Sequence, residues 1–446
     1  MTTPFSQLGR FLREDSLKST LIRGVMGSAG LKAAYALLTL AIAILLARAL
    51  GAEGYGVYAF AFSLISLLAV PAQVGLPQLL VREIAKYRHQ ENWGRLRGLL
   101  RRSNQIAVGL SLALAAAAAG GAFVLSMRAS PIQIDTFLWA LPLIPLIALG
   151  NLRGAALQGL KRVVQGQLPE AVLRPGFLLV LAGAAWLFGT LTPPSAMALH
   201  ALAAGLAFAI GAALLQRHRP AQSVIAVPEY ETRAWLRSMV PLSLLTGMMI
   251  INSQADIVML GLFTTSEEVG IYRAASQGAA LVVFFLTAVN MVIAPYISQL
   301  YTAGEMERLQ RLATASARGI LLAALPVVLA FILFGEKVLT IAFGAEYAPG
   351  YLPLAILSAG QLVNAAAGSV GLLLNMSGHE RDTARGVAVA TVSNVVLNLI
   401  LIPRFGMTGA AIATAVTLVI WNTLLCRQVW VRMGIQSTAI RFPVTR

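Results

Sequence analysis

Repeated apolar runs of 18 or more residues constrain this chain more than any other sequence feature. One α-helix of about that length crosses the hydrocarbon core of a bilayer. The chain is 58% hydrophobic and only 12% charged, whereas a soluble domain is roughly 25% charged. The sequence therefore predicts an all-α polytopic membrane protein.

Twelve such runs can be placed, and a charged linker divides them into two sets of six. They lie at about 24–49, 55–80, 104–126, 135–156, 169–189 and 195–215, then at about 239–263, 270–298, 319–335, 351–376, 386–402 and 407–426. We therefore expect about 12 transmembrane helices in two six-helix bundles. The predicted division is a tail at 1–23, bundles at 24–215 and 239–426, a linker at 216–238 and a tail at 427–446.

A glycine-rich stretch between the first two runs recurs in the second half. Gly51, Gly54 and Gly56 lie within six residues, which predicts a tight reversal of the backbone. Gly56 and Tyr58 align with Gly270 and Tyr272, 214 positions later. The match indicates a duplication, so we expect the two bundles to be pseudo-symmetric.

The basic residues predict the orientation. With both termini in the cytoplasm, 27 of the 34 lysines and arginines fall in inside segments, and only Arg128, Lys337 and Arg404 fall in outside loops. Cytoplasmic loops of membrane proteins carry such an excess. The same distribution accounts for the net charge of +16 without a nucleic-acid partner.

Lys32, Arg174 and Asp256 lie well inside apolar runs, where an ionisable residue costs about 3 kcal/mol on insertion scales. Lys32 either extends to the cytoplasmic headgroups or faces a cavity, and Arg174 either pairs with Glu170 or contacts substrate. Pro175 should loosen the helix beside Arg174. Asp256 either binds a coupling cation or proton, or pairs with an arginine. Arg48 and Arg273, near helix ends, are expected to extend to the membrane surface.

Amide side chains form polar stripes in the second half. Gln361, Asn364 and Asn375 share a helical face with Ser358, and Asn252 lies one turn before Asp256. Thr391, Asn394 and Asn398 repeat the pattern in the eleventh run. Such stripes either join helices or line a water-filled cavity. We favour a cavity whose candidate residues are Lys32, Arg174, Asn252, Gln361, Asn364 and Asn375.

Common catalytic and metal-binding motifs are missing from the sequence. It contains no G-x-x-x-x-G-K-[ST], H-E-x-x-H or C-x-x-C pattern, and its four histidines are scattered singly. The single cysteine, Cys426, excludes an internal disulfide. We therefore expect no catalytic residues, no metal and no cofactor, and a transporter in place of an enzyme.

Several motifs in order resemble one family over about residues 20–425. They are Ala47–Gly51 through Tyr55–Tyr58, Val74–Pro77, Asp256–Gly261, Glu268–Tyr272 and Gly409–Thr414. Together they resemble the oligosaccharide flippases within the superfamily of multidrug extruders, lipopolysaccharide-type polysaccharide transporters and lipid II flippases. Twelve runs match the flippase and extruder branches.

The resemblance implies two six-helix bundles facing each other in a V in the inner cell membrane. It also implies alternating access that moves a polyprenyl-diphosphate oligosaccharide outward through a cationic cavity, driven by a proton or sodium gradient or by use of the product. Expected partners are membrane lipids, polysaccharide polymerase and glycosyltransferases. A cation-coupled multidrug extruder and, less favoured, a membrane sugar polymerase remain alternatives.

Overall fold

The computed structural model describes residues 17–125 and 129–439. The start of the N-terminal tail, Arg128 and the last residues of the C-terminal tail lie outside the described residues. Every regular element in these two ranges is a helix. They are α2 (Leu17–Gln73), α3 (Leu76–His89), α4 (Trp93–Leu125), α5 (Pro131–Ala140), α6 (Leu143–Gly159), α7 (Val163–Leu168), the π-helix η1 (Pro169–Leu173), α8 (Arg174–Leu187), α9 (Pro193–His218), α10 (Ala221–Ile225), α11 (Thr232–Phe263), α12 (Ser266–Thr302), α13 (Met306–Ala342), the 3₁₀-helix η2 (Ala345–Gly350), α14 (Tyr351–Ala367), α15 (Val370–Met376) and α16 (Glu380–Met433).

The helices confirm a multi-pass membrane protein. Nine helices among the described residues are long and apolar enough to cross a membrane, or ten if the bent pair of α14 and α15 counts as one. α2 and α16 contain 57 and 54 residues, more than twice the roughly 20 residues that one crossing requires. Gly51 and Gly406 break their helical geometry, so each can cross twice. Twelve crossings, like the cytoplasmic placement of both termini, remains a prediction.

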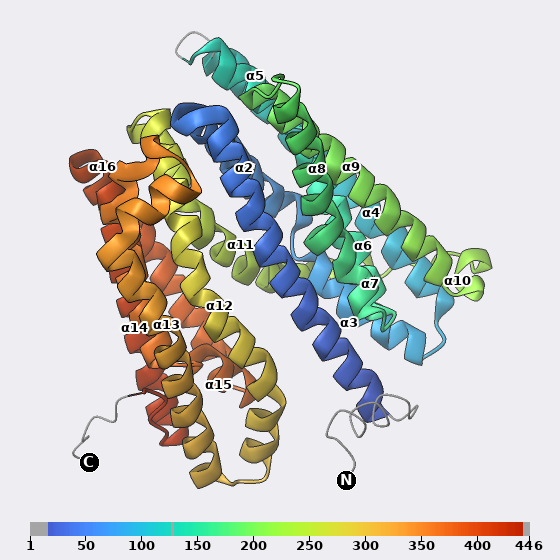
Figure 1. Cartoon of the computed structure of the whole chain (residues 1–446). Coiled ribbons are helices and arrows are strands. Elements are labelled where there is room, and N and C mark those ends of the chain that lie inside the picture. The colour runs from blue at the N-terminus through green and yellow to red at the C-terminus, as the bar shows by residue number, and fades with distance from the viewer. Residues whose placement is uncertain (1–16, 126–128, 440–446) are drawn as a thin grey trace, which may run out of the picture.

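The helices form two groups (Figure 1). α4 to α9 lie on one side of α2, whereas α12 to α16 lie on the other. α11 passes behind α2 and connects the groups. The groups approach each other at one end and diverge at the end where α2 begins and α16 finishes. The predicted topology places the diverging end in the cytoplasm, and the opposite end is called the outer end below.

The backbone reverses at Gly51 alone. Its φ of 69° lies in the region that glycine tolerates best, and the helix restarts at Ala52. The carboxylate Oε2 of Glu346 accepts a hydrogen bond from the Ala52 N–H at 2.9 Å, so the new helix end is capped by a residue of η2. The prediction of a turn built from three glycines was wrong, because Gly54 and Gly56 lie inside the restarted helix.

Gly56 does not form the turn, but it allows close contact between the two halves. A β-carbon on Gly56 would overlap the carbonyl oxygen of Ser266, and one on Gly270 would overlap the carbonyl oxygen of Ala52. Ser266 follows Ala52 by 214 positions, the offset of the sequence repeat. The contact between α2 and α12 is therefore reciprocal, as expected for a pseudo-twofold relation between the helices.

Further bonds join the halves at the outer end. The Arg48 guanidinium donates to the carbonyl oxygens of Ala342, at 2.9 Å, and Ile341, at the end of α13. The buried Tyr347 hydroxyl donates to the carbonyl oxygen of Ala47 at 3.1 Å. Arg48 is exposed at this end of the helix, and its extension to the membrane surface stays a prediction. We call Arg48, Glu346 and Tyr347, with the groups they bind, the outer closure.

Candidate substrate and ion sites

A small pocket between the two halves contains two arginines. It has a volume of about 100 Å³ and lies among α2, α8, α9 and α12. We call it the cation pocket, and its polar and aromatic lining consists of Tyr35, Thr39, Tyr55, Tyr58, Phe62, Arg174, His200, Arg273 and Gln277. Arg174 belongs to the first half and Arg273 to the second, so the pocket depends on how the halves pack.

A local distortion positions Arg174. The turn before it is the π-helix η1, a form that often marks functional sites, so the loosening expected at Pro175 is confirmed. Glu170 lies 3.3 Å from Arg174, and their side chains are 20% and 16% exposed. A β-carbon on Gly150 would overlap the Glu170 carboxylate. A larger residue at position 150 would therefore require the Glu170 side chain to shift.

The aromatic wall includes a histidine that the sequence alone did not place in a site. The Tyr58 hydroxyl lies 2.8 Å from His200 Nδ1, and the rings of Phe62 and His200 stack with centroids 4.9 Å apart. Arg273 interacts with the Tyr55 side chain. The expectation that Arg273 extends to the membrane surface was wrong, because it lines this interior pocket. The sequence repeat could have indicated a place for Arg273 near the contact between the halves, since Arg273 directly follows Tyr272, the residue that aligns with Tyr58.

Asp256 lies at the centre of a buried network in the second half. Its Oδ2 accepts hydrogen bonds from the Tyr272 hydroxyl at 2.8 Å and the Thr414 hydroxyl at 2.5 Å. Its Oδ1 accepts one from Asn398 Nδ2 at 2.7 Å. Asn398 Nδ2 also donates to Asn394 Oδ1 at 3.1 Å. Four neutral side chains therefore surround one carboxylate, and no arginine forms an ion pair with it within the described chain.

The Asp256 network is rich in oxygen atoms. Besides the carboxylate, it contains the Thr414 hydroxyl, the Asn394 carbonyl and the Asn398 carbonyl, and the last is buried without a hydrogen-bond partner. Small hard cations prefer oxygen ligands. In 17–125 and 129–439, no group of three or more His, Cys, Asp or Glu could hold a metal. The donor set suits a proton or a monovalent cation.

The other predicted cavity residues are dispersed. Lys32 is exposed on α2. Asn252 is half-buried on α11, with its carbonyl oxygen buried and unpaired. Asn364 Nδ2 donates to Gln361 Oε1 at 3.3 Å on α14, and Asn375 is exposed on α15. None of them lines the cation pocket.

The shared face predicted for Ser358 and Asn375 was wrong. Gly368 adopts a φ of 75° between α14 and α15, and the two helices bend by 41° relative to each other. A positive φ ends a helix. Gln361 and Asn364 still follow Ser358 on one helix, whereas Asn375 does not continue that stripe.

Known proteins resemble this chain in sequence and in fold. The family model described as polysaccharide biosynthesis protein matches residues 21–301. A curated relative from Haloferax volcanii, named probable low-salt glycan biosynthesis flippase Agl15, is 30% identical over 173 residues. That match covers 39% of this chain and only 36% of the relative.

Two solved structures share the fold over most of their length. A multidrug resistance MATE family transporter of the MOP superfamily, in an inward-facing conformation, has a TM-score of 0.71 at 15% identity. The match covers 90% of this chain and 94% of the transporter chain. The lipid II flippase MurJ, in an inward closed conformation, also has a TM-score of 0.71 at 15% identity, covering 89% and 85%. On the family match, which extends over more than half of the sequence, this chain belongs to the polysaccharide biosynthesis protein family.

Proposed function

We propose that this protein is a flippase that moves a polyprenyl-diphosphate-linked oligosaccharide from the cytoplasmic to the outer leaflet of the plasma membrane. The observation that carries the proposal is the cation pocket, where Arg174 and Arg273 from opposite halves line one space. Guanidinium groups bind phosphate oxygens strongly, often through two parallel hydrogen bonds. The curated relative's name as a glycan biosynthesis flippase and the family match support a glycan-bearing lipid.

The proposed transport cycle is alternating access. The halves diverge at the predicted cytoplasmic end (Figure 1), and the outer closure holds them together at the other end. The diphosphate enters the cation pocket from the cytoplasmic leaflet. The outer closure then breaks and the halves meet at the cytoplasmic end, as in other transporters built from repeated halves.

Asp256 is the proposed coupling site. A proton or sodium ion bound to its carboxylate neutralises the buried charge on α11 and changes the bonds of Asp256 to its neutral partners on α12 and α16. Such binding would favour one arrangement of the second half.

The cation pocket bears on the alternatives. A multidrug extruder for cationic drugs favours a lining that is both carboxylate-rich and aromatic, whereas the cation pocket is aromatic but carries two arginines that repel a cation. Glu170, the acid beside the cation pocket, is paired with Arg174.

The proposed partners are the enzymes that act before and after transport. Glycosyltransferases supply the lipid-linked oligosaccharide on the inner leaflet, and a surface polysaccharide polymerase consumes it on the outer leaflet.

The proposal can be tested in cells of the strain that encodes this chain. Depletion of the protein should strand the lipid-linked oligosaccharide on the cytoplasmic leaflet, where an outside glycosidase or lectin cannot reach it. Re-expression of the wild-type chain should restore access. Unchanged access after complete depletion, with no second flippase compensating, would refute the proposal.

A further inference from the structure

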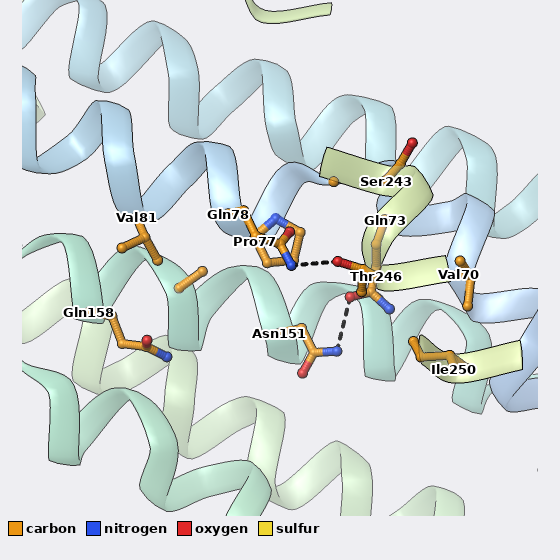
Figure 2. Close-up of a pocket in the computed structure, with 12 residues that line it drawn as sticks. Val70, Gln73, Pro77, Gln78, Val81, Asn151, Gln158, Ser243, Thr246 and Ile250 are labelled. Atoms are coloured by element: carbon orange, nitrogen blue, oxygen red, sulfur yellow. Dashed lines mark hydrogen bonds between the residues drawn. The ribbon is translucent and has the colours of Figure 1, made fainter. Parts of the chain in front are cut away.

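A second polar pocket lies at the cytoplasmic end of the contact between the halves. It has a volume of about 340 Å³, at the lower end of the range for small-molecule sites. α2 and α3 supply one wall, α6 a second and α11 the third (Figure 2). We call it the amide pocket, and its polar side chains are Gln73, Gln78, Asn151, Gln158, Ser243 and Thr246.

The break between α2 and α3 shapes this pocket. Gly75 has a φ of 71° and Val74 a φ of 42°, and Pro77 lies in the first turn of α3. A left-handed conformation at two successive residues turns the chain sharply. The turn places Gln73, the last residue of α2, and Gln78, the third residue of α3, around one space (Figure 2).

The lining is polar but uncharged. Four carboxamides and two hydroxyls face the pocket, and none of its described lining residues is acidic or basic. Carboxamides both donate and accept hydrogen bonds, so this lining suits neutral groups that do the same. Sugar hydroxyls and acetamido groups are such groups. A diphosphate or a cation would find no opposite charge here.

Interhelical bonding uses only part of this capacity. Gln78 Nε2 donates to Thr246 Oγ1 at 2.8 Å and joins the two halves. Asn151 Nδ2 donates to Gln73 Oε1 at 3.0 Å and joins α6 to α2. The side chain of Gln158 lines the pocket but forms no hydrogen bond within residues 17–125 and 129–439, whereas its backbone carbonyl accepts one from the Lys161 N–H. Helix packing explains the first two contacts but gives no reason for the free amide of Gln158.

The amide pocket and the cation pocket lie along the same face of α2. Gln73 follows Phe62 by 11 residues, which is about three helical turns and about 16 Å. Phe62 lines the cation pocket and Gln73 lines the amide pocket. A ligand with an anionic group and a neutral sugar chain attached to it can extend along this face from one pocket to the other.

We propose that the amide pocket binds the sugar portion of the transported lipid while its diphosphate occupies the cation pocket. This inference rests on the proposed flippase function. The sugar portion lies toward the cytoplasm in this arrangement, so glycosylated lipid is preferred over bare lipid before transport. Gln158 and Gln78 are the specificity residues, because the Gln158 amide forms no side-chain hydrogen bond and the Gln78 amide uses only one N–H, in its bond to Thr246.

The test compares two probes with the purified full-length protein in detergent. The probes are bare undecaprenyl diphosphate and the lipid-linked oligosaccharide extracted from the strain that encodes this chain. The wild-type protein should bind the glycosylated lipid more tightly. Gln158→Leu should weaken that binding about two- to tenfold, the range for one lost neutral hydrogen bond, and leave the bare lipid unaffected.

Two further variants sharpen the result. Gln78→Leu should act in the same direction as Gln158→Leu, so the conclusion does not depend on one substitution. Gln222→Leu, an exposed amide on α10, is the matched control and should change neither affinity.

The outcomes separate the inference from the proposed function. If the wild-type protein binds neither lipid, the flippase proposal fails. If it binds both lipids equally, or if Gln158→Leu weakens both to the same extent, the amide pocket is not a sugar site although the flippase proposal survives.

Discussion

At the scale of single residues, the two arginines of the cation pocket differ in their surroundings. Arg174 is paired with Glu170 at 3.3 Å, whereas Arg273 faces the same space from the other half with no acid in the pocket lining. Arg273 therefore supplies most of the uncompensated positive charge. In the proposed transport cycle the distance between the two arginines changes, because they belong to opposite halves.

Arg174→Gln and Arg273→Gln should each lower transport of lipid diphosphate by about tenfold or more. Hydrogen bonds to charged groups contribute about 1.5–3 kcal/mol, and a factor of ten corresponds to about 1.4 kcal/mol. Lys32→Ala should have a smaller effect, because Lys32 lies outside the pocket lining. Transport in reconstituted vesicles measures this, with the exposed Arg217→Gln as control. Full activity of both pocket variants would remove the arginines from the substrate path.

Asp256→Asn should abolish the response of transport to an imposed ion gradient. The substitution keeps the side-chain volume and removes the charge that a cation or proton would neutralise, within a network buried among α11, α12 and α16. Transport at zero gradient and with a proton or sodium gradient should become equal. Asp135→Asn, an exposed acid on α5, should keep the wild-type response. An unchanged response in Asp256→Asn would exclude this carboxylate as the coupling site.

Single residues also show what the sequence alone can predict. Asp256 could be found because an acid inside an apolar run is costly, and Asn394 and Asn398 because they share a helical face. That Asn398 donates to Asp256 could not be predicted, since the two residues lie 142 positions apart. The sequence predicted only part of the cation pocket. Arg174 was predicted as a cavity residue, whereas the positions of Arg273 and His200 in the pocket depend on the packing of four helices.

At the scale of helices, the reciprocal glycine contact decides how closely α2 and α12 approach. The sequence predicted that Gly56 and Gly270 were equivalent, but equivalence does not imply contact. The structure adds that each glycine faces the carbonyl oxygen four residues before the other, Ser266 for Gly56 and Ala52 for Gly270. No side chain can replace a hydrogen atom at this crossing without separating the helices.

Gly56→Ala should therefore reduce both transport and thermal stability. Replacement of glycine by alanine within a helix ordinarily stabilises by roughly 0.5–1 kcal/mol, so a loss would show that the close approach dominates. Gly109→Ala on α4 is the matched control, because a β-carbon there would meet nothing within 4 Å. Heat denaturation of the purified proteins measures the effect. Equal or higher stability for Gly56→Ala would contradict the tight crossing.

The outer closure predicts a different result for Glu346. Its carboxylate caps the helix that restarts at Ala52, and loss of a helix cap costs about 1 kcal/mol. Glu346→Ala should open the outer end about fivefold more often, whereas Glu346→Gln keeps an acceptor oxygen and should change less. A cysteine at the buried Ala59, in a Cys426→Ala background, reports opening through labelling by a membrane-impermeant thiol reagent from outside. Equal labelling of the introduced cysteine in the proteins with Glu346, with Glu346→Ala and with Glu346→Gln would show that the cap does not hold the outer end closed.

At the scale of the whole molecule, the apolar runs predicted the all-helical membrane fold because hydrophobic length is a local property. The breaks within the helices were harder to predict from the sequence. Gly51 and Gly406 interrupt α2 and α16 through non-helical backbone angles at a single residue each, and Gly368 diverts a stripe that a straight helix would have continued. The amide pocket could not be predicted from the sequence, because Gln73, Gln78 and Asn151 come from three different helices.

In the proposed function, lipid-linked diphosphate crosses the membrane through the space between the two halves. The leaflet location of undecaprenyl-diphosphate oligosaccharide can be measured in vesicles reconstituted with the wild-type protein, with an Arg174→Gln/Arg273→Gln double variant and without protein. We expect rapid movement between leaflets with the wild-type protein only, faster under an imposed proton or sodium gradient. Movement at the wild-type rate with the double variant, or none with the wild-type protein, would contradict the proposed function.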